Sequence, residues 1–142
     1  MSQRTLAIIK PDAVRRKLIG EIITAITQAG FHIVGLKLVH MTKEQAESFY
    51  DVHRGRFFFE ELTRFMSSGP VVVMVLQKEQ AVEDFRSLIG ATDPTEAAAG
   101  TIRHRFGTSK GENAIHGSDS LESAEREIAF FFSSIELVDH AP

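Results

Sequence analysis

The sequence predicts an α/β sandwich, and three observations support this prediction. Of the 142 residues, 43% are hydrophobic and 25% are charged, which is ordinary for one globular domain covering residues 1–142. Short apolar runs without helical spacing indicate buried strands at residues 6–9, 31–40 and 71–76. The segments between them place apolar residues at helical spacing. Strands separated by helices are typical of an α/β sandwich.

The first predicted strand, residues 6–9, ends at Lys10 because Pro11 follows it. A helix is expected next, with Gly30 where it would end. Its apolar positions have helical spacing and are Leu18, Ile19, Ile22, Ile23 and Ile26. Residues 31–40 then indicate the second strand.

Thr42 can cap the amide of Gln45, and the Gln45 side chain can return the bond, which predicts a helix running towards Tyr50. Another short helix is expected over residues 58–66. The strand at 71–76 is apolar at every position, so we expect both of its faces to be buried.

Residues 81–89 predict a further helix, and residues 91–117 an irregular stretch too long for a plain connection. The last helix is expected to begin near Asp119, with a short final strand at residues 135–138. This order fits a ferredoxin-like fold. Such a fold is a four-stranded antiparallel sheet built from two split βαβ halves, with helices covering one face.

Composition excludes several classes of function. With no cysteine, the chain has no disulfides, thiolate chemistry or cysteine-bound zinc, which suits a reducing cytoplasm. A net charge of −3 argues against binding nucleic acid through bulk charge. No apolar segment approaches the ~18 residues of a membrane span or forms a secretory signal. P-loop, dinucleotide-binding, protein-kinase, HExxH and GxSxG motifs are absent.

Among the six histidines, His116 is distinctive because Gly117 leaves room beside it and Ser118 and Asp119 can open a helix. A helix N-terminus favours anions. On spacing alone, His116 is either a nucleophile or a plain loop residue beside a helix cap. Lys10, Arg86 and Arg103 either line an anion pocket with it or are solvated surface charges.

The run Phe57-Phe58-Phe59 cannot hide all three rings on one side of a helix, so at least one is expected to be exposed. An exposed ring offers a stacking platform or an interface patch. The alternative is packing in the core or against another subunit.

Several ordered segments together resemble the nucleoside diphosphate kinase family over essentially the whole chain. The pattern Asn113-xx-His116-Gly117-Ser118-Asp119 is similar to the family's active-site motif. The other matching segments are residues 5–12, 68–71, 90–94 and 100–103. The resemblance implies a phosphotransferase with a ping-pong reaction. In it, the γ-phosphoryl group of a nucleoside triphosphate, usually ATP, passes through a phosphohistidine to a nucleoside diphosphate.

By this resemblance His116 is the nucleophile, attacking through Nδ1, and Ser118 and Glu127 orient it. Lys10 would contact the γ-phosphate and the sugar hydroxyl, and Asn113 the same hydroxyl. The remaining implied contacts are Tyr50 and Arg103 at the transferred group, His53, Arg86 and Thr92 at the inner phosphates, and Phe58 stacked on the base. Mg²⁺ would be held through the nucleotide phosphates, with no direct protein ligand.

Two positions depart from the family. Phe57 stands where the family usually has proline, which makes the position of Phe58 less defined. Arg105 stands where an acidic residue is frequent, which removes an ion-pair partner.

The resemblance also implies a cytoplasmic homo-oligomer. Because the chain ends soon after Val138, a tetramer is favoured over a hexamer. The alternative function is a non-enzymatic ferredoxin-like module that binds nucleotides or single-stranded nucleic acid, suggested by the basic and aromatic stretch at residues 54–59. No membrane association and no specific nucleic acid are expected.

Overall fold

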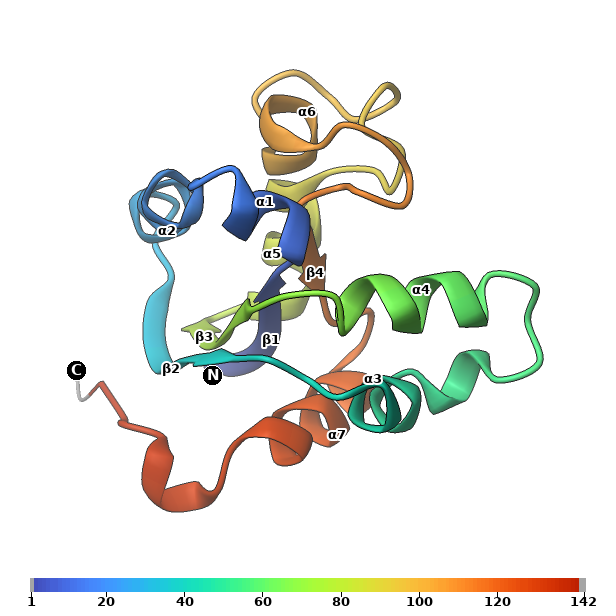
Figure 1. Ribbon diagram of the computed structural model, residues 1–142. Coiled ribbons are helices and arrows are strands. Elements are labelled where there is room, and N and C mark those ends of the chain that lie inside the picture. The colour runs from blue at the N-terminus through green and yellow to red at the C-terminus, as the bar shows by residue number, and fades with distance from the viewer. Residues whose placement is uncertain (1, 141–142) are drawn as a thin grey trace.

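The computed structural model describes residues 2–140, and its centre is a four-stranded antiparallel sheet (Figure 1). The strands stand in the spatial order β2-β3-β1-β4, so β2 and β4 form its two edges. Their bounds are Gln3–Ile9 for β1, His32–Val39 for β2, Val71–Lys78 for β3 and Ile115–Gly117 for β4. The four-stranded antiparallel sheet predicted from the sequence is therefore confirmed.

Helices cover both faces of the sheet, which corrects the expectation of helices on one face. Figure 1 shows α1, α2, α5 and α6 above the sheet, α3 and α7 below it and α4 beside it; α4 packs into the same hydrophobic cluster as α3 and α7. The upper helices are α1 (Pro11–Arg15), α2 (Ile19–Gln28), α5 (Ala81–Ile89) and α6 (Ile102–Phe106). The others are α3 (Lys43–Phe49), α4 (Phe59–Met66) and α7 (Leu121–Phe131).

The alternation of side chains along β3 explains the two covered faces. Val72 and Met74 join one hydrophobic cluster, whereas Val71 and Val73 join the other. Because successive side chains of a strand point to opposite faces, an unbroken apolar strand needs cover on both sides. The unbroken apolar run in the sequence therefore predicted correctly that both faces of this strand are buried.

The local signals predicted at the start of α3 and the end of α2 are also confirmed. Thr42 accepts a hydrogen bond from the Gln45 amide and its own amide donates to the Gln45 side chain, which completes the capping box. Gly30 and Gly90 follow α2 and α5 with φ of 96° and 88°, a backbone region that favours glycine.

The chain between residues 91 and 117 is more ordered than expected. It contains α6 and the whole of β4, whereas the predicted strand at residues 135–138 is wrong. In its place a 3₁₀ turn, Ser134–Glu136, is followed by one bond from the Val138 amide to the Val34 carbonyl (2.8 Å). The last helix is capped by Ser120, not by Ser118 or Asp119.

Gly117 is required for a different reason from the one expected. A Cβ at this position would lie 2.8 Å from Phe85 and 3.1 Å from Ile89, both on α5, so helix packing rather than space for the histidine ring demands glycine.

Gly117→Ala should therefore lower the free energy of unfolding by about 1–3 kcal/mol through overpacking. Urea denaturation measures this loss. Gly111→Ala is the control, because its methyl group would meet nothing within 4 Å. Equal stability of Gly117→Ala and the wild type would contradict the packing argument.

Candidate active site

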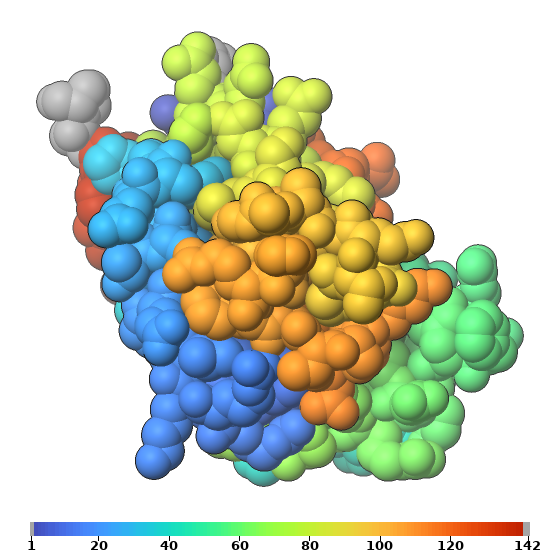
Figure 2. Space-filling view, turned by 90° about the horizontal axis from the view of Figure 1, so that it is seen from above, coloured from blue at the N-terminus to red at the C-terminus, as the bar shows by residue number. Residues whose placement is uncertain are grey.

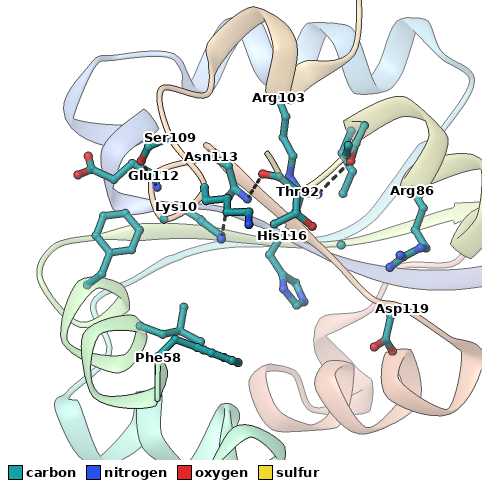
Figure 3. Close-up of a pocket in the computed structure, with 18 of the residues that line it drawn as sticks. Lys10, Phe58, Arg86, Thr92, Arg103, Ser109, Glu112, Asn113, His116 and Asp119 are labelled. Carbon is teal, nitrogen blue, oxygen red and sulfur yellow. Dashed lines mark hydrogen bonds between the residues drawn. The ribbon is translucent and has the colours of Figure 1, made fainter. Parts of the chain in front are cut away.

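A cleft of about 1140 Å³ opens beside the β4 edge of the sheet. Its lower wall comes from the segment linking α3 to α4, and its upper wall from α5 and residues 90–113. Figure 2 looks down on that upper segment, with the green linker protruding beside it, and Figure 3 looks into the cleft. Nine of the residues to which the family resemblance assigns a role line it: Lys10, Tyr50, His53, Phe58, Arg86, Thr92, Arg103, Asn113 and His116.

Strand pairing fixes the position of His116. The residue lies on β4 directly opposite Ile8 of β1, so it is part of the sheet and not of a loop. Its ring packs edge-on against Phe49, with the centroids 5.7 Å apart. Figure 3 shows the imidazole pointing into the cleft.

Ser118 and Glu127 lie behind this ring, outside the cleft, in a short chain of hydrogen bonds. His116 Nε2 is 2.9 Å from Glu127 Oε1, and Ser118 Oγ donates to the same oxygen at 2.8 Å. The Leu6 amide in turn donates to Ser118 Oγ (3.1 Å). Because a carboxylate oxygen accepts, this geometry places a proton on Nε2 and leaves the lone pair of the neutral ring on Nδ1.

Glu127 and Tyr50 are polar groups in a largely apolar setting. The Glu127 residue is only 6% exposed, because it follows Ala124 by three positions on the buried side of α7. The Tyr50 hydroxyl is buried and has no hydrogen-bond partner among the described residues. Burial, together with the negative charge of Glu127, raises the pKa of Tyr50, so this phenol keeps its proton.

Lys10 is a buried cation and Arg103 a half-buried one. Burial and the neighbouring Arg103 charge lower the pKa of Lys10 to about 8. Burial and the nearby Arg86 lower the pKa of Arg103 to about 10. These side chains are therefore not the solvated surface charges that the sequence left as an alternative. Cations close enough to lower the pKa of a neighbouring cation favour an anion among them.

Neutral contacts hold these cations in place. Arg103 donates to the carbonyls of Gly90 (3.0 Å) and Ile115 (2.9 Å). Lys10 Nζ donates to Asn113 Oδ1 (2.9 Å), and Asn113 Nδ2 donates to the Thr92 carbonyl (3.0 Å). Figure 3 marks the contacts of Asn113 on both sides.

An apolar wall faces these polar groups. Phe58 precedes α4, and Leu62 and Phe65 follow it by four and seven residues, so the three side chains share one side of the helix. The opposite wall includes Ser109 and Glu112, which sequence reasoning missed. Helical spacing was a usable signal for Leu62 and Phe65, whereas no pattern marks the two residues opposite.

Comparison with known proteins identifies the family. A family model described as nucleoside diphosphate kinase matches residues 3–137. The chain belongs to the nucleoside diphosphate kinase family. Curated relatives of that name include one from Chlorobium chlorochromatii, 60% identical over 96% of this chain and 97% of the relative. Another, from Chlorobaculum parvum, is 58% identical with the same coverage.

Solved structures agree with this assignment. The nucleoside diphosphate kinase of Aquifex aeolicus superposes with a TM-score of 0.96 at 52% identity, covering 97% of this chain and 100% of the other. A halophilic nucleoside diphosphate kinase from Halobacterium salinarum in complex with CDP gives 0.95 at 43% identity, with coverage of 100% and 95%. The chain is thus a nucleotide phosphotransferase by family, and the ferredoxin-like fold is confirmed.

The buried amine of Lys10 gives a test of the site's electrostatics. A lysine whose pKa is lowered on folding destabilises the native state below its folded pKa, and this cost disappears as the pH rises towards the unfolded value. Lys10→Met should therefore be more stable than the wild type at pH 7. The difference should shrink by on the order of 3 kcal/mol by pH 10.5.

Urea denaturation at a series of pH values measures this difference. The exposed Lys110→Met is the control and should show no such trend. A difference between Lys10→Met and the wild type that is constant from pH 7 to 10.5 would mean that the amine keeps its proton in the folded protein.

Proposed function

We propose that the chain transfers the γ-phosphoryl group of a nucleoside triphosphate to a nucleoside diphosphate through a phosphohistidine on His116. The observation that carries this proposal is the 2.9 Å contact between His116 Nε2 and Glu127 Oε1. With Nε2 held, Nδ1 is the nitrogen that can attack phosphorus. Ser118 supports the same carboxylate and thereby positions the ring.

The chemistry balances over two half-reactions. In the first, a bond forms between His116 Nδ1 and the γ-phosphorus as the bond from that phosphorus to the bridging oxygen of the donor breaks. The departing nucleoside diphosphate keeps that electron pair. In the second, a terminal oxygen of another nucleoside diphosphate displaces Nδ1 by the reverse path. A neutral imidazole with its lone pair on Nδ1 suits both steps.

The cations of the cleft would bind the phosphates of the nucleotide. Lys10 and Arg103 would contact the transferred group, where little covalent help is needed and charge neutralisation matters most. Tyr50, a neutral phenol with an unused buried hydroxyl, would stand beside it. Asn113, already bonded to Lys10, would share a sugar hydroxyl with that amine.

The outer part of the cleft would hold the rest of the nucleotide. His53, Arg86 and Thr92 would bind the inner phosphates, and Phe58 would stack on the base. Stacking tolerates different bases because every base has an aromatic face. This supports the use of several nucleoside tri- and diphosphates, with ATP as the usual donor.

Mg²⁺ is the cofactor we propose, held through phosphate oxygens. Within residues 2–140, no group of three or more histidine or carboxylate side chains is arranged to hold a metal ion. A cleft rich in cations fits a metal that arrives on its nucleotide, and Mg²⁺ commonly binds in this way. When bound, it would neutralise charge on the phosphates.

Beyond the single chain, we propose one domain over residues 1–142 that assembles as a homo-oligomer, with a tetramer favoured over a hexamer. Leu36 and Leu38 support assembly, because both are exposed on the edge strand β2.

No helix among residues 2–140 has the length and apolar character needed to cross a membrane. We propose a cytoplasmic location, and no specific nucleic acid as partner.

The test of the mechanism is intact-mass measurement after incubation with ATP and Mg²⁺. The wild type should gain one phosphoryl group per chain, stable in base and lost in acid, and chelation of Mg²⁺ should prevent the gain. His116→Ala should gain none. A His116→Ala protein that exchanges phosphate at the wild-type rate would refute the mechanism.

Substitutions of Arg103 and of Arg86 should change different kinetic parameters. Charge redistributes around the transferred group in the transition state, so Arg103→Ala should lower the maximal rate of His116 phosphorylation. Arg86 holds inner phosphates equally in both states, so Arg86→Ala should mainly raise the half-saturating ATP concentration.

Single-turnover rates across a range of ATP concentrations separate the two effects. If Arg103→Ala reached the wild-type maximal rate at high ATP, Arg103 would not act on the transferred group.

A further inference from the structure

The side chain of Phe57 has no role in the fold. It is 97% exposed, whereas Phe59 is buried and Phe58 is half-buried. Its ring nevertheless lines the cleft and meets Phe58 edge-on, with the centroids 5.4 Å apart and the rings at 90°. A ring that is almost fully exposed and still lines a cavity stands at its mouth.

The turn that carries Phe57 retains the geometry that proline would favour. The Phe59 amide donates to the Arg56 carbonyl (3.1 Å), and Phe58 has φ −90° and ψ −3°, the values of the third residue of a type I turn. Phe57 is then the second residue, where proline is preferred. The departure from the family therefore leaves the turn intact and adds an aromatic ring.

The neighbours of Phe58 leave the added ring available to a ligand. His53 packs edge-on against Phe58 at 5.2 Å, and the Arg56 guanidinium lies 5.8 Å from the Phe58 centroid. Phe59 is covered by the core and by Arg54 at 5.0 Å. Phe57 is neither packed in the core nor covered by an arginine side chain. Burying its exposed phenyl ring against a ligand would be favourable.

We propose that Phe57 is a second aromatic contact for the nucleobase and favours purine over pyrimidine nucleotides. This inference rests on the proposed function, in which the base stacks on Phe58. In this proposal the base lies flat on Phe58 with its outer edge towards the perpendicular ring of Phe57. Purines join the sugar through their five-membered ring, so their six-membered ring extends farther towards the mouth than a pyrimidine does.

The test is isothermal titration calorimetry of the full chain with ADP and with CDP, both with Mg²⁺. Phe57→Ala should raise the Kd for ADP about fivefold, as expected when roughly 40 Å² of apolar surface is no longer buried, and the Kd for CDP less than twofold. The heat-capacity change on binding ADP should become less negative. Phe57→Tyr should keep the wild-type preference.

Two further variants distinguish the effect of the Phe57 ring on binding from the effect of backbone stiffness and from the general effect of losing an exposed apolar side chain. Phe57→Pro should match Phe57→Ala, and ADP binding at wild-type strength by Phe57→Pro would overturn the proposal in favour of loop stiffness. Ile135→Ala removes another highly exposed apolar side chain, which lies outside the cleft, and should leave both Kd values unchanged.

The outcomes also distinguish this inference from the proposed function. A wild type that binds neither nucleotide overturns both. A wild type that binds both, with Phe57→Ala unchanged towards ADP, overturns only the role of Phe57. The same holds if Phe57→Ala changes only the mass of the assembly in solution, because the ring would then contact a second copy of the chain.

Discussion

The antiparallel pairing of β4 with β1 is the constraint on which the site depends. Ile9 lies opposite Ile115 and Ile8 opposite His116, and the Lys10 amide extends the ladder by donating to the Ala114 carbonyl (2.9 Å). This register brings together side chains more than one hundred residues apart, so that Lys10 bonds to Asn113. A shift by one residue would turn His116 to the opposite face of the sheet and away from Glu127.

Electrostatics then follow from what the sheet and the helices bury. Lys10 is buried at the end of a strand, and the half-buried Arg103 is fixed by two backbone carbonyls, so both cations lose part of their hydration. Their depressed pKa values show that the free protein bears an electrostatic cost. A polyanionic ligand would relieve that cost, so the same burial that destabilises the empty cleft strengthens phosphate binding.

The sequence predicted the features that short-range patterns encode. The apolar strand β3 and the capping box at Thr42 each depend on neighbouring residues, and both were found. Strand β4 was missed because three residues carry no periodicity, and α1 because five residues hold little more than one turn. Their formation depends on partners distant in the chain.

The residues of the candidate site also fall into two groups: those that a sequence motif reveals and those whose contacts depend on packing. His116 and Asn113 belong to a compact motif that the sequence displays. The contact of Glu127 with His116 could not be read from spacing, because it depends on how α7 packs beneath β1. The partnerless hydroxyl of Tyr50 is likewise a consequence of packing. Resemblance to the family named these residues, and the structure supplies their contacts.

The two sides of the cleft differ in construction, and this matches the precision that each needs. The phosphate side is built on sheet pairing and buried hydrogen bonds, which suits phosphoryl transfer because small displacements of the reacting atoms reduce rates severely. The base side projects from the linker between α3 and α4. The ion pair that joins these two helices, Lys43–Glu60 (2.8 Å), is open to solvent and contributes little stability. A stacking surface needs only a flat ring in contact with the plane of the base. An additional ring at the mouth can therefore adjust base preference without disturbing the groups that hold the phosphates.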